Sequence, residues 1–131
     1  MTLSPAKSAL DVGVVVSDLS ASLAFYSDLL GLAVAGEIDL PFGKLVRLSF
    51  GDSFLKLLSP PSTPQAQSSP LTDRAGIQYI TFQISNIDDA NARITAEGVP
   101  VDMPLQELIP GLKVLMIRDP DGNIVELIER L

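Results

Sequence analysis

Two charged residues that interrupt apolar runs are the first candidates for chemistry. Lys56 lies within the run Phe-Leu-Lys-Leu-Leu, and Glu126 lies within the run Ile-Val-Glu-Leu-Ile. Burial of an unpaired charge is strongly unfavourable, so each side chain either reaches solvent from a half-buried strand or meets an opposite charge. An ammonium and a carboxylate brought together can serve as general acid and general base on a carbonyl or enol substrate.

The composition narrows the chemistry further. The 131 residues include no His and no Cys. This removes the commonest metal ligand, the usual general base near neutral pH, thiol catalysis and disulfide bonds. Carboxylate, Tyr, Lys, Arg, Ser or backbone groups must therefore carry any activity.

Charge and hydropathy indicate the kind of partner. The net charge is −7, and the nine basic residues are scattered singly, so we expect neither nucleic acid nor a membrane as a partner. No apolar run approaches the length of a membrane span, and the first residues lack the pattern of a signal peptide. We expect a cytoplasmic protein with a small-molecule ligand or substrate.

Residues 9–58 predict one strand, one helix and three further strands. The β-branched run at its start suits a strand buried on both faces. Ser20 is the expected N-cap of a helix over residues 20–30, and Gly31 is expected to end it. The turn residues that follow delimit three strands, at 32–38, 44–50 and 53–58.

Residues 76–129 predict the same order again. A strand at 77–85 precedes a helix capped by Asp88 and stopped by Gly98. Three strands follow at 99–103, 112–117 and 123–128, with a turn at 119–123 before the last. Between the halves, residues 59–75 contain four prolines and are expected to form an extended surface connection.

The two halves align with each other in sequence. Asp11 aligns with Tyr79 at an offset of 68 residues, and Lys56 aligns with Glu126 at an offset of 70. A repeat of this kind indicates a βαβββ unit used twice within an α+β fold. Asp11 and Tyr79 therefore join Lys56 and Glu126 as a candidate cluster.

Three segments resemble the vicinal oxygen chelate superfamily, which contains glyoxalase I, bleomycin-resistance proteins and extradiol dioxygenases. They are VGVVVSDLSASLAFYSDLLGL near the start, GIQYITFQISNID in the middle and RDPDGNIVELIE at the end. The resemblance implies one domain over residues 1–131, made of two βαβββ modules at 9–58 and 76–129. These modules would form a curved mixed sheet around a cavity.

The resemblance also implies where a site would lie. Metal-using relatives take one ligand from the first and one from the last strand of each module, which here correspond to Asp11, Lys56, Tyr79 and Glu126. Of these, only Glu126 matches the ligand pattern well. Asp11 could bind a hard cation through oxygen, neutral Tyr79 would be a poor ligand, and the Lys56 ammonium would repel a cation. We therefore expect no metal and no cofactor. One hypothesis places the Lys56 ammonium where the metal would sit, paired with Asp11 or Glu126 and with Tyr79 bonded to the same cluster; the other leaves the charges in solvent.

Four further residues are candidates for substrate binding. Arg47 and Arg118 could each clamp a substrate carboxylate, or could lie solvated at strand ends. Met103 and Met116 could line an adaptable apolar pocket, or could belong to the core.

Three functions remain open at this point. The first is a metal-independent protein that accommodates a small, largely apolar organic molecule between its modules, with or without acid–base chemistry of the isomerase or lyase type. The second is a drug-sequestering binding protein like those of bleomycin resistance, and the acidic net charge would favour a cationic drug. The third is a metal-dependent enzyme of glyoxalase or dioxygenase type. In each case we expect a homodimer.

Overall fold

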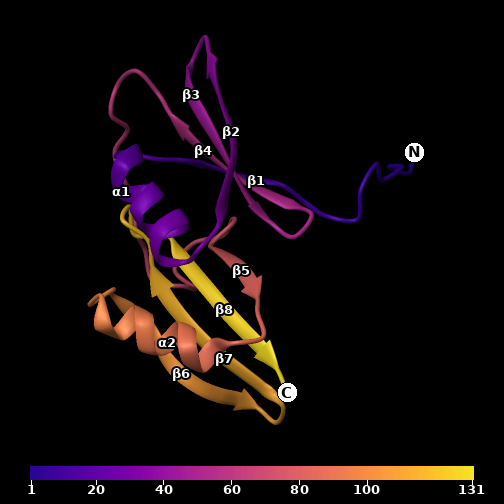
Figure 1. The fold of residues 1–131 in the computed structure, drawn as a ribbon, viewed down its shortest axis with the longest axis vertical. Helices are drawn as coiled ribbons and strands as arrows, with labels where there is room; N and C mark the ends of the chain where they lie inside the picture. Colours follow the sequence, from indigo (N-terminus) through magenta and orange to yellow (C-terminus); the bar gives the residue numbers. More distant parts are fainter. The chain divides into compact units, whose positions relative to one another are not determined.

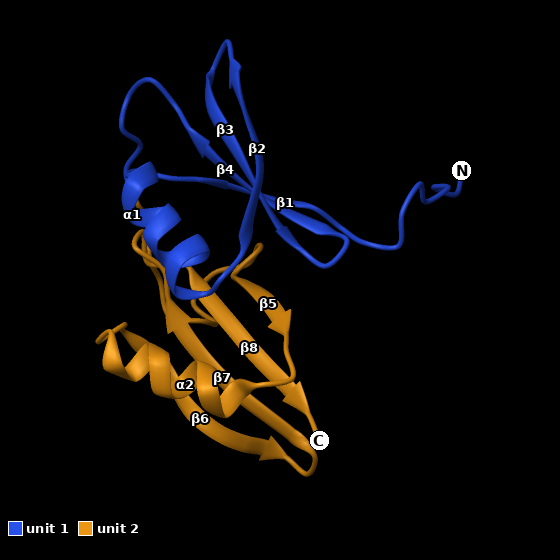
Figure 2. Ribbon diagram, in the orientation of Figure 1, with its two compact units in different colours: residues 1–65 blue, residues 66–131 orange.

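The structure is a computed structural model that describes residues 1–131. The chain forms two compact units, Met1–Gln65 and Ala66–Leu131 (Figure 2). The boundary falls inside the proline-rich connection. Each unit contains one helical segment and a four-stranded mixed sheet (Figure 1). The predicted α+β fold of two βαβββ modules is confirmed. No helix has the length and apolarity needed to cross a membrane.

Unit 1 has the strand order β1-β4-β3-β2, in which β1 runs parallel to β4 and the other pairs are antiparallel. Its helix continues from α1 into a short π-helical segment, η1. The elements are β1 (Val12–Val15), α1 (Leu19–Leu23), η1 (Ala24–Leu29), β2 (Ala33–Leu40), β3 (Gly43–Phe50) and β4 (Ser53–Ser59).

The helix of unit 1 begins two residues earlier than the sequence predicts. Asp18, not Ser20, is the N-cap, and its carboxylate accepts a hydrogen bond from the Ala21 amide at 3.1 Å. Both residue types are good caps, and the extended backbone of Asp18 gives it the capping geometry. Gly31 follows the helix with a φ of 83°, as its predicted role requires.

The sheet of unit 1 has two unlike faces. Helix α1 packs against β4, and the residues of β3 and β4 that point to this face are buried: Val46, Leu48, Leu55 and Leu57. In β1, Val12 and Val14 are half-buried while Gly13 and Val15 are exposed. The prediction that this strand is buried on both faces is wrong, because β1 is an edge strand and α1 covers only one side.

Unit 2 repeats this topology with the order β5-β8-β7-β6, β5 being parallel to β8. Its elements are β5 (Tyr79–Gln83), α2 (Ile87–Ala96), β6 (Val101–Ile109), β7 (Leu112–Arg118) and β8 (Ile124–Arg130). Strand β6 is longer than predicted and contains Pro104. It lies at the sheet edge, and its pairing is irregular between Met103 and Gln106, which are the conditions under which a strand accepts proline.

The start of α2 also differs from the prediction. Asn86 is the N-cap residue, and Asp88 lies in the first turn, where its charge favours the helix dipole. The amide of Ile87 donates to a carboxylate oxygen of Glu129 on β8 at 3.1 Å. The carboxylate that accepts from the first turn of α2 therefore belongs to Glu129, which is remote in sequence, whereas the sequence predicted that Asp88 would cap this helix.

Both faces of the sheet in unit 2 carry buried apolar residues. Helix α2 packs on β7 and β8, and Leu115, Ile117, Val125 and Leu127 are buried there. On the opposite face, a second cluster consists of Val114, Met116 and Ile124, with Leu71, Met103, Leu112 and Ile128 packed against it.

Candidate functional site

Lys56 and Glu126 occupy equivalent positions in the two sheets. In unit 1, Gly13 of β1 lies opposite Lys56 of β4. In unit 2, Thr81 of β5 lies opposite Glu126 of β8. The pairing therefore reproduces the offsets of 68 and 70 residues between the halves. Both side chains project from the face away from the helix of their own unit, here called the distal face, because strand residues alternate between faces.

A row of four residues crosses the distal face of unit 1. Arg47 of β3 lies opposite Lys56, and Gly36 of β2 lies opposite Arg47. Together with Gly13 these residues form what we call the cationic row. The sequence reasoning identified Arg47 and Lys56 separately, and strand pairing makes them direct neighbours.

The two cations of the cationic row form no ion pair within unit 1. Neither Lys56 nor Arg47 has a hydrogen bond or a salt bridge to another group of that unit. The Arg47 guanidinium lies 4.9 Å from the centre of the Phe54 ring, a favourable cation–π contact. Like charges directly opposite on paired strands repel each other, so this row is not arranged for stability.

Asp11 has a different partner from the one expected. A single carboxylate oxygen accepts from the Lys7 ammonium at 2.6 Å and from the Phe54 amide at 2.8 Å. The hydrogen bond from Lys7, followed by that from Phe54, lowers the pKa of Asp11, and the charge of Lys56 adds a smaller effect in the same direction. The expected salt bridge between Lys56 and Asp11 is therefore not formed. Lys7, which the sequence reasoning missed, takes that place.

The equivalent row of unit 2 has other chemistry. It runs from Thr81 through Glu126 and Met116 to Met103, and we call it the methionine row. The Thr81 hydroxyl donates to Glu126 at 2.7 Å. Met116 is only 5% exposed and belongs to the apolar cluster of the distal face. Tyr79 has 48% of its surface exposed, and its hydroxyl makes no hydrogen bond to Glu126.

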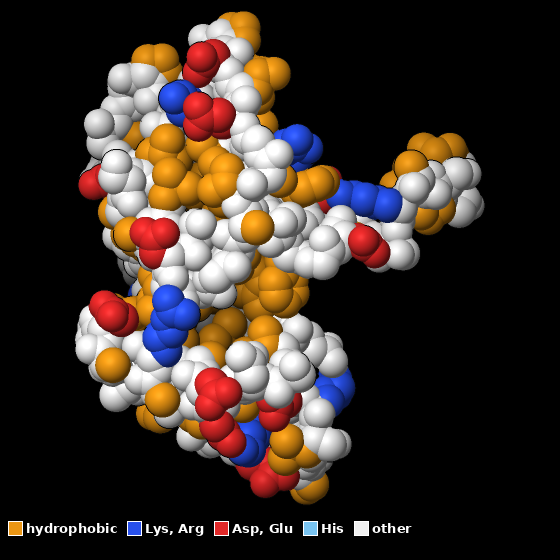
Figure 3. Space-filling view, viewed as in Figure 1, with side chains coloured by type: hydrophobic (Ala, Val, Ile, Leu, Met, Phe, Trp, Pro, Cys, Tyr) orange, Lys and Arg blue, Asp and Glu red, His pale blue; other side chains and the backbone are white.

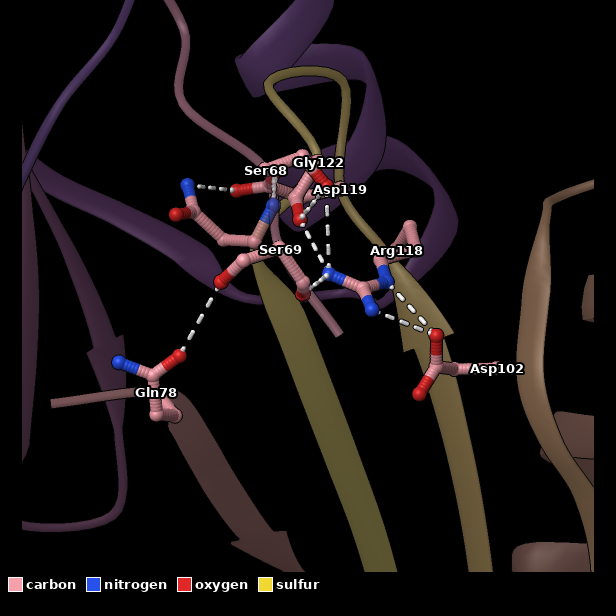
Figure 4. A network of polar contacts seen from close by, with 8 residues as sticks. Ser68, Ser69, Gln78, Asp102, Arg118, Asp119 and Gly122 are labelled. Atoms are coloured by element: carbon pink, nitrogen blue, oxygen red, sulfur yellow. Dashed lines mark hydrogen bonds and ion pairs between the residues drawn. The ribbon is translucent and has the colours of Figure 1, made fainter. Parts of the chain in front are cut away.

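Arg118, the other predicted clamp, is occupied by the protein itself (Figure 4). Its guanidinium donates to Asp102 at 2.6 and 2.9 Å and to the carbonyls of Ser69 and Gly122 at 3.1 and 2.8 Å. It thereby ties the end of the proline-rich connection to the turn between β7 and β8. We interpret Arg118 as a structural residue.

The turn beside Arg118 is held by a buried carboxylate. Asp119 accepts hydrogen bonds from the Asp121 and Asn123 amides and from the Asn123 side chain. This confirms the turn predicted at 119–123, and it explains the roles of Asp119 and Asn123 in that turn.

The four positions that would supply metal ligands do not form a suitable donor set. In unit 1, the bonded oxygen of Asp11 already has two donors, and the Lys56 ammonium has no lone pair to offer. In unit 2, Tyr79 supplies a phenol, and Glu126 supplies the one carboxylate. No group of three or more His, Cys, Asp or Glu side chains that could hold a metal ion is present. The side chains at these positions do not suit a divalent cation.

The sequence reasoning also missed the glycines of the cationic row. A methyl group added at Gly36 would lie 3.3 Å from the Arg47 guanidinium, whereas one added at Gly13 would meet nothing within 4 Å. An isolated glycine inside a strand is a signal of close approach by another group. At Gly36 the structure shows such an approach, by the Arg47 guanidinium, and at Gly13 it shows none.

Comparison with known proteins places this arrangement in a family. The chain is 27% identical over 124 residues to the uncharacterized protein YaeR of Escherichia coli, an alignment that covers 91% of this chain and 93% of that protein. It is 26% identical to the structure of lactoylglutathione lyase from Agrobacterium tumefaciens, with 96% of each chain covered and a TM-score of 0.69. TnmS3, an antibiotic binding protein from Streptomyces sp. CB03234, is 23% identical, with 98% of this chain and 100% of that chain covered and a TM-score of 0.74.

The match to a family profile extends over residues 9–127, which include every helix and strand of both units except the last three residues of β8. The matched range contains Asp11, Lys56, Tyr79 and Glu126. The chain belongs to the Glyoxalase/Bleomycin resistance protein/Dioxygenase superfamily.

Proposed function

We propose that this protein binds a small, largely apolar organic molecule and does so without a divalent metal. The observation that carries the proposal is Lys56, a cation that forms no hydrogen bond or ion pair within unit 1 and occupies a position equivalent to that of Glu126. A site built to hold a metal would not place an ammonium there. Membership of the superfamily supports small-molecule binding in general, and the ligand itself is part of the proposal.

An apolar row beside the cationic row supports the apolar character of the ligand. Val15, Leu58, Leu45 and Ile38 lie opposite one another across the four strands of unit 1. They project from the same distal face as Lys56. Val15 and Ile38 are 53% and 54% exposed, so they offer apolar surface that a ligand can remove from water.

Acid–base chemistry on the bound molecule is an extension of this proposal. The candidate groups are Lys56 and Asp11 in unit 1 and Tyr79 and Glu126 in unit 2. Lys56 and Tyr79 can donate a proton, while Asp11 and Glu126 can accept one. Glu126 is the better base candidate, because its only donor is a neutral hydroxyl, whereas Asp11 is bonded to an ammonium. Such chemistry would be of the isomerase or lyase type.

Elemental analysis tests the metal-free part of the proposal. We expect the purified protein to contain no stoichiometric Zn, Ni, Mn or Fe, and we expect chelators to leave ligand binding unchanged. Lys56→Glu serves as the matched variant, because it places a carboxylate at the position where relatives have a metal ligand. One metal ion per wild-type chain, lost together with binding on chelation, would contradict the proposal.

A second candidate function is sequestration of a drug. The likeness to an antibiotic binding protein and the net charge of −7 favour it, and Figure 3 shows Asp and Glu side chains spread over the visible face of both units. The cationic row opposes a cationic drug at the distal face of unit 1. Binding without turnover of the molecule would support sequestration, and product formation that is lost in Glu126→Gln would support the enzyme.

The homodimer expected from the sequence stays a prediction. Edge strands β1, β2, β5 and β6 carry exposed apolar residues, among them Val34 and Leu108, and pairing between subunits would cover such surface. Light scattering should give about twice the mass of the 14.0 kDa chain. A monomer at high micromolar concentration would contradict it.

A further inference from the structure

We infer that Arg47 and Lys56 together form a subsite for an anionic group of the bound molecule, most directly a carboxylate. This inference rests on the proposed function, because it assigns one end of the small molecule that the protein is proposed to bind. The anion would lie on the distal face of unit 1, across strands β3 and β4. The apolar row of Val15, Leu58, Leu45 and Ile38 would contact the rest of the molecule.

Local charge is the first argument. The chain as a whole carries a net charge of −7, yet Lys7 and Arg47 both lie over the Phe54 ring. Lys56 lies opposite Arg47 and near enough to Asp11 to lower the pKa of that carboxyl. Lys7 forms the short hydrogen bond with Asp11 and so takes up its charge. Two positive charges remain next to each other, and an anion between them would remove their mutual repulsion.

The space around the pair is the second argument. The outer positions of the cationic row are Gly13 and Gly36, which contribute no side chain of their own at either end. At Gly13, nothing lies within 4 Å of where a Cβ would be, which leaves open volume beside Lys56. At Gly36, the absence of a side chain leaves room for the Arg47 guanidinium. Bulky residues at these positions would block an anion from reaching the pair.

The chemistry of the two side chains is the third argument. The guanidinium of Arg47 is planar and can bind both oxygens of a carboxylate, while Lys56 supplies a compact charge beside it. The Phe54 ring lies 4.9 Å from the Arg47 guanidinium carbon and limits its orientation. The donors of Arg47 are free for a ligand, in contrast to those of Arg118, which are bonded to the protein.

Matched probes that differ in charge test the inference. Isothermal titration calorimetry would compare 1-naphthylacetate with its uncharged amide, and with 1-naphthyl phosphate as the alternative oxyanion. We expect wild-type protein to bind 1-naphthylacetate at least about tenfold more tightly than the amide, because hydrogen bonds to charged groups are the stronger ones. This preference should disappear in Lys56→Met and in Arg47→Met.

The control variant is Lys44→Met. Lys44 is on the same strand as Arg47, but its side chain belongs to the set of alternate residues that face the helix side, and it pairs with Glu37 at 3.8 Å. The substitution Lys44→Met removes one positive charge from the same sheet and should leave the preference for 1-naphthylacetate over its amide unchanged. The urea midpoints of all three variants should stay close to that of wild type, which shows that lost binding is not lost folding.

The outcomes separate the inference from the proposed function. Equal affinity of wild type for the acid and the amide, or a preference that survives both Lys56→Met and Arg47→Met, overturns the anion subsite and leaves small-molecule binding in place. Binding of none of the three probes overturns both. Tighter binding of 1-naphthyl phosphate with the same dependence on Arg47 and Lys56 supports the oxyanion subsite and overturns the choice of carboxylate.

Discussion

The two units of this protein share a topology and differ in what that topology presents. Gly13, Lys56, Arg47 and Gly36 in unit 1 occupy the same strand positions as Thr81, Glu126, Met116 and Met103 in unit 2. The first row holds two cations that form no ion pair within unit 1, and the second holds a buried methionine and a hydrogen-bonded carboxylate. Repetition of a fold therefore fixes positions and leaves the chemistry at each position free to diverge.

The surroundings of each row explain what it can do. In unit 2, Met116 packs with Val114 and Ile124, so the distal face contributes to the core. In unit 1, the buried core residues of β3 and β4 point to the helix face, and the distal face carries the charged pair. A row inside a core stabilises the fold, whereas a row of unpaired charges is available to a ligand.

Substitution at the third position of each row should give the largest effect. Met116→Glu would place a second carboxylate opposite Glu126 within the apolar cluster of unit 2 and should lower the free energy of unfolding by about 3–5 kcal/mol, the usual cost of an uncompensated buried charge. The variant at the equivalent position of unit 1, Arg47→Met, should change it by less than about 1 kcal/mol. Urea unfolding measures both. Equal losses in the two variants would mean that the rows do not differ as described.

Removal of Arg118 should give an intermediate effect. Arg118→Met leaves Asp102 without its partner and frees the carbonyls of Ser69 and Gly122, so we expect a loss of about 2–3 kcal/mol. Arg130→Met, at the exposed end of β8, is the matched control and should cost less than about 0.5 kcal/mol. The comparison with Arg47→Met then separates an arginine that holds the fold from one that is free for a ligand. If Arg118→Met unfolds at the wild-type urea midpoint, the interpretation of Arg118 as a structural residue is wrong.

The smallest expected effect concerns pH. The pKa of Asp11 is lowered in the folded protein, chiefly by the hydrogen bond from Lys7. The stability that Asp11 contributes is therefore present above its unfolded pKa and is lost as the pH falls through its folded pKa. Asp11→Asn should reduce the loss of thermal stability between pH 6 and pH 3. Tyr79→Phe, at the equivalent position of unit 2, is the control and should lose as much thermal stability over this pH range as wild type. If Asp11→Asn also loses as much as wild type, the contact between Lys7 and Asp11 does not contribute to stability.

Much of the architecture follows from local features of the sequence. The hydrophobic patterns, the glycines at 31 and 98 and the aspartate-rich turn at 119–123 predict the elements and their order, because each depends on residues close together in the chain. The offsets of 68 and 70 residues predict that Lys56 and Glu126 are equivalent, and the strand pairing agrees. The choice of Asp18 over Ser20 as a cap was open locally, since both residue types fit.

Tertiary structure alone decided which remote groups meet. Arg118 is bonded to Asp102 and Ser69, and the Ile87 amide donates to Glu129. Lys7 and Asp11 are only four residues apart, but the Phe54 amide that shares the Asp11 oxygen comes from the remote strand β4. The sequence by itself determined that Arg47 and Lys56 are charged residues on strands. Only the antiparallel register of β3 and β4 placed them opposite each other, because strand pairing joins residues that are remote in the chain, and a shift of one residue would have sent them to opposite faces.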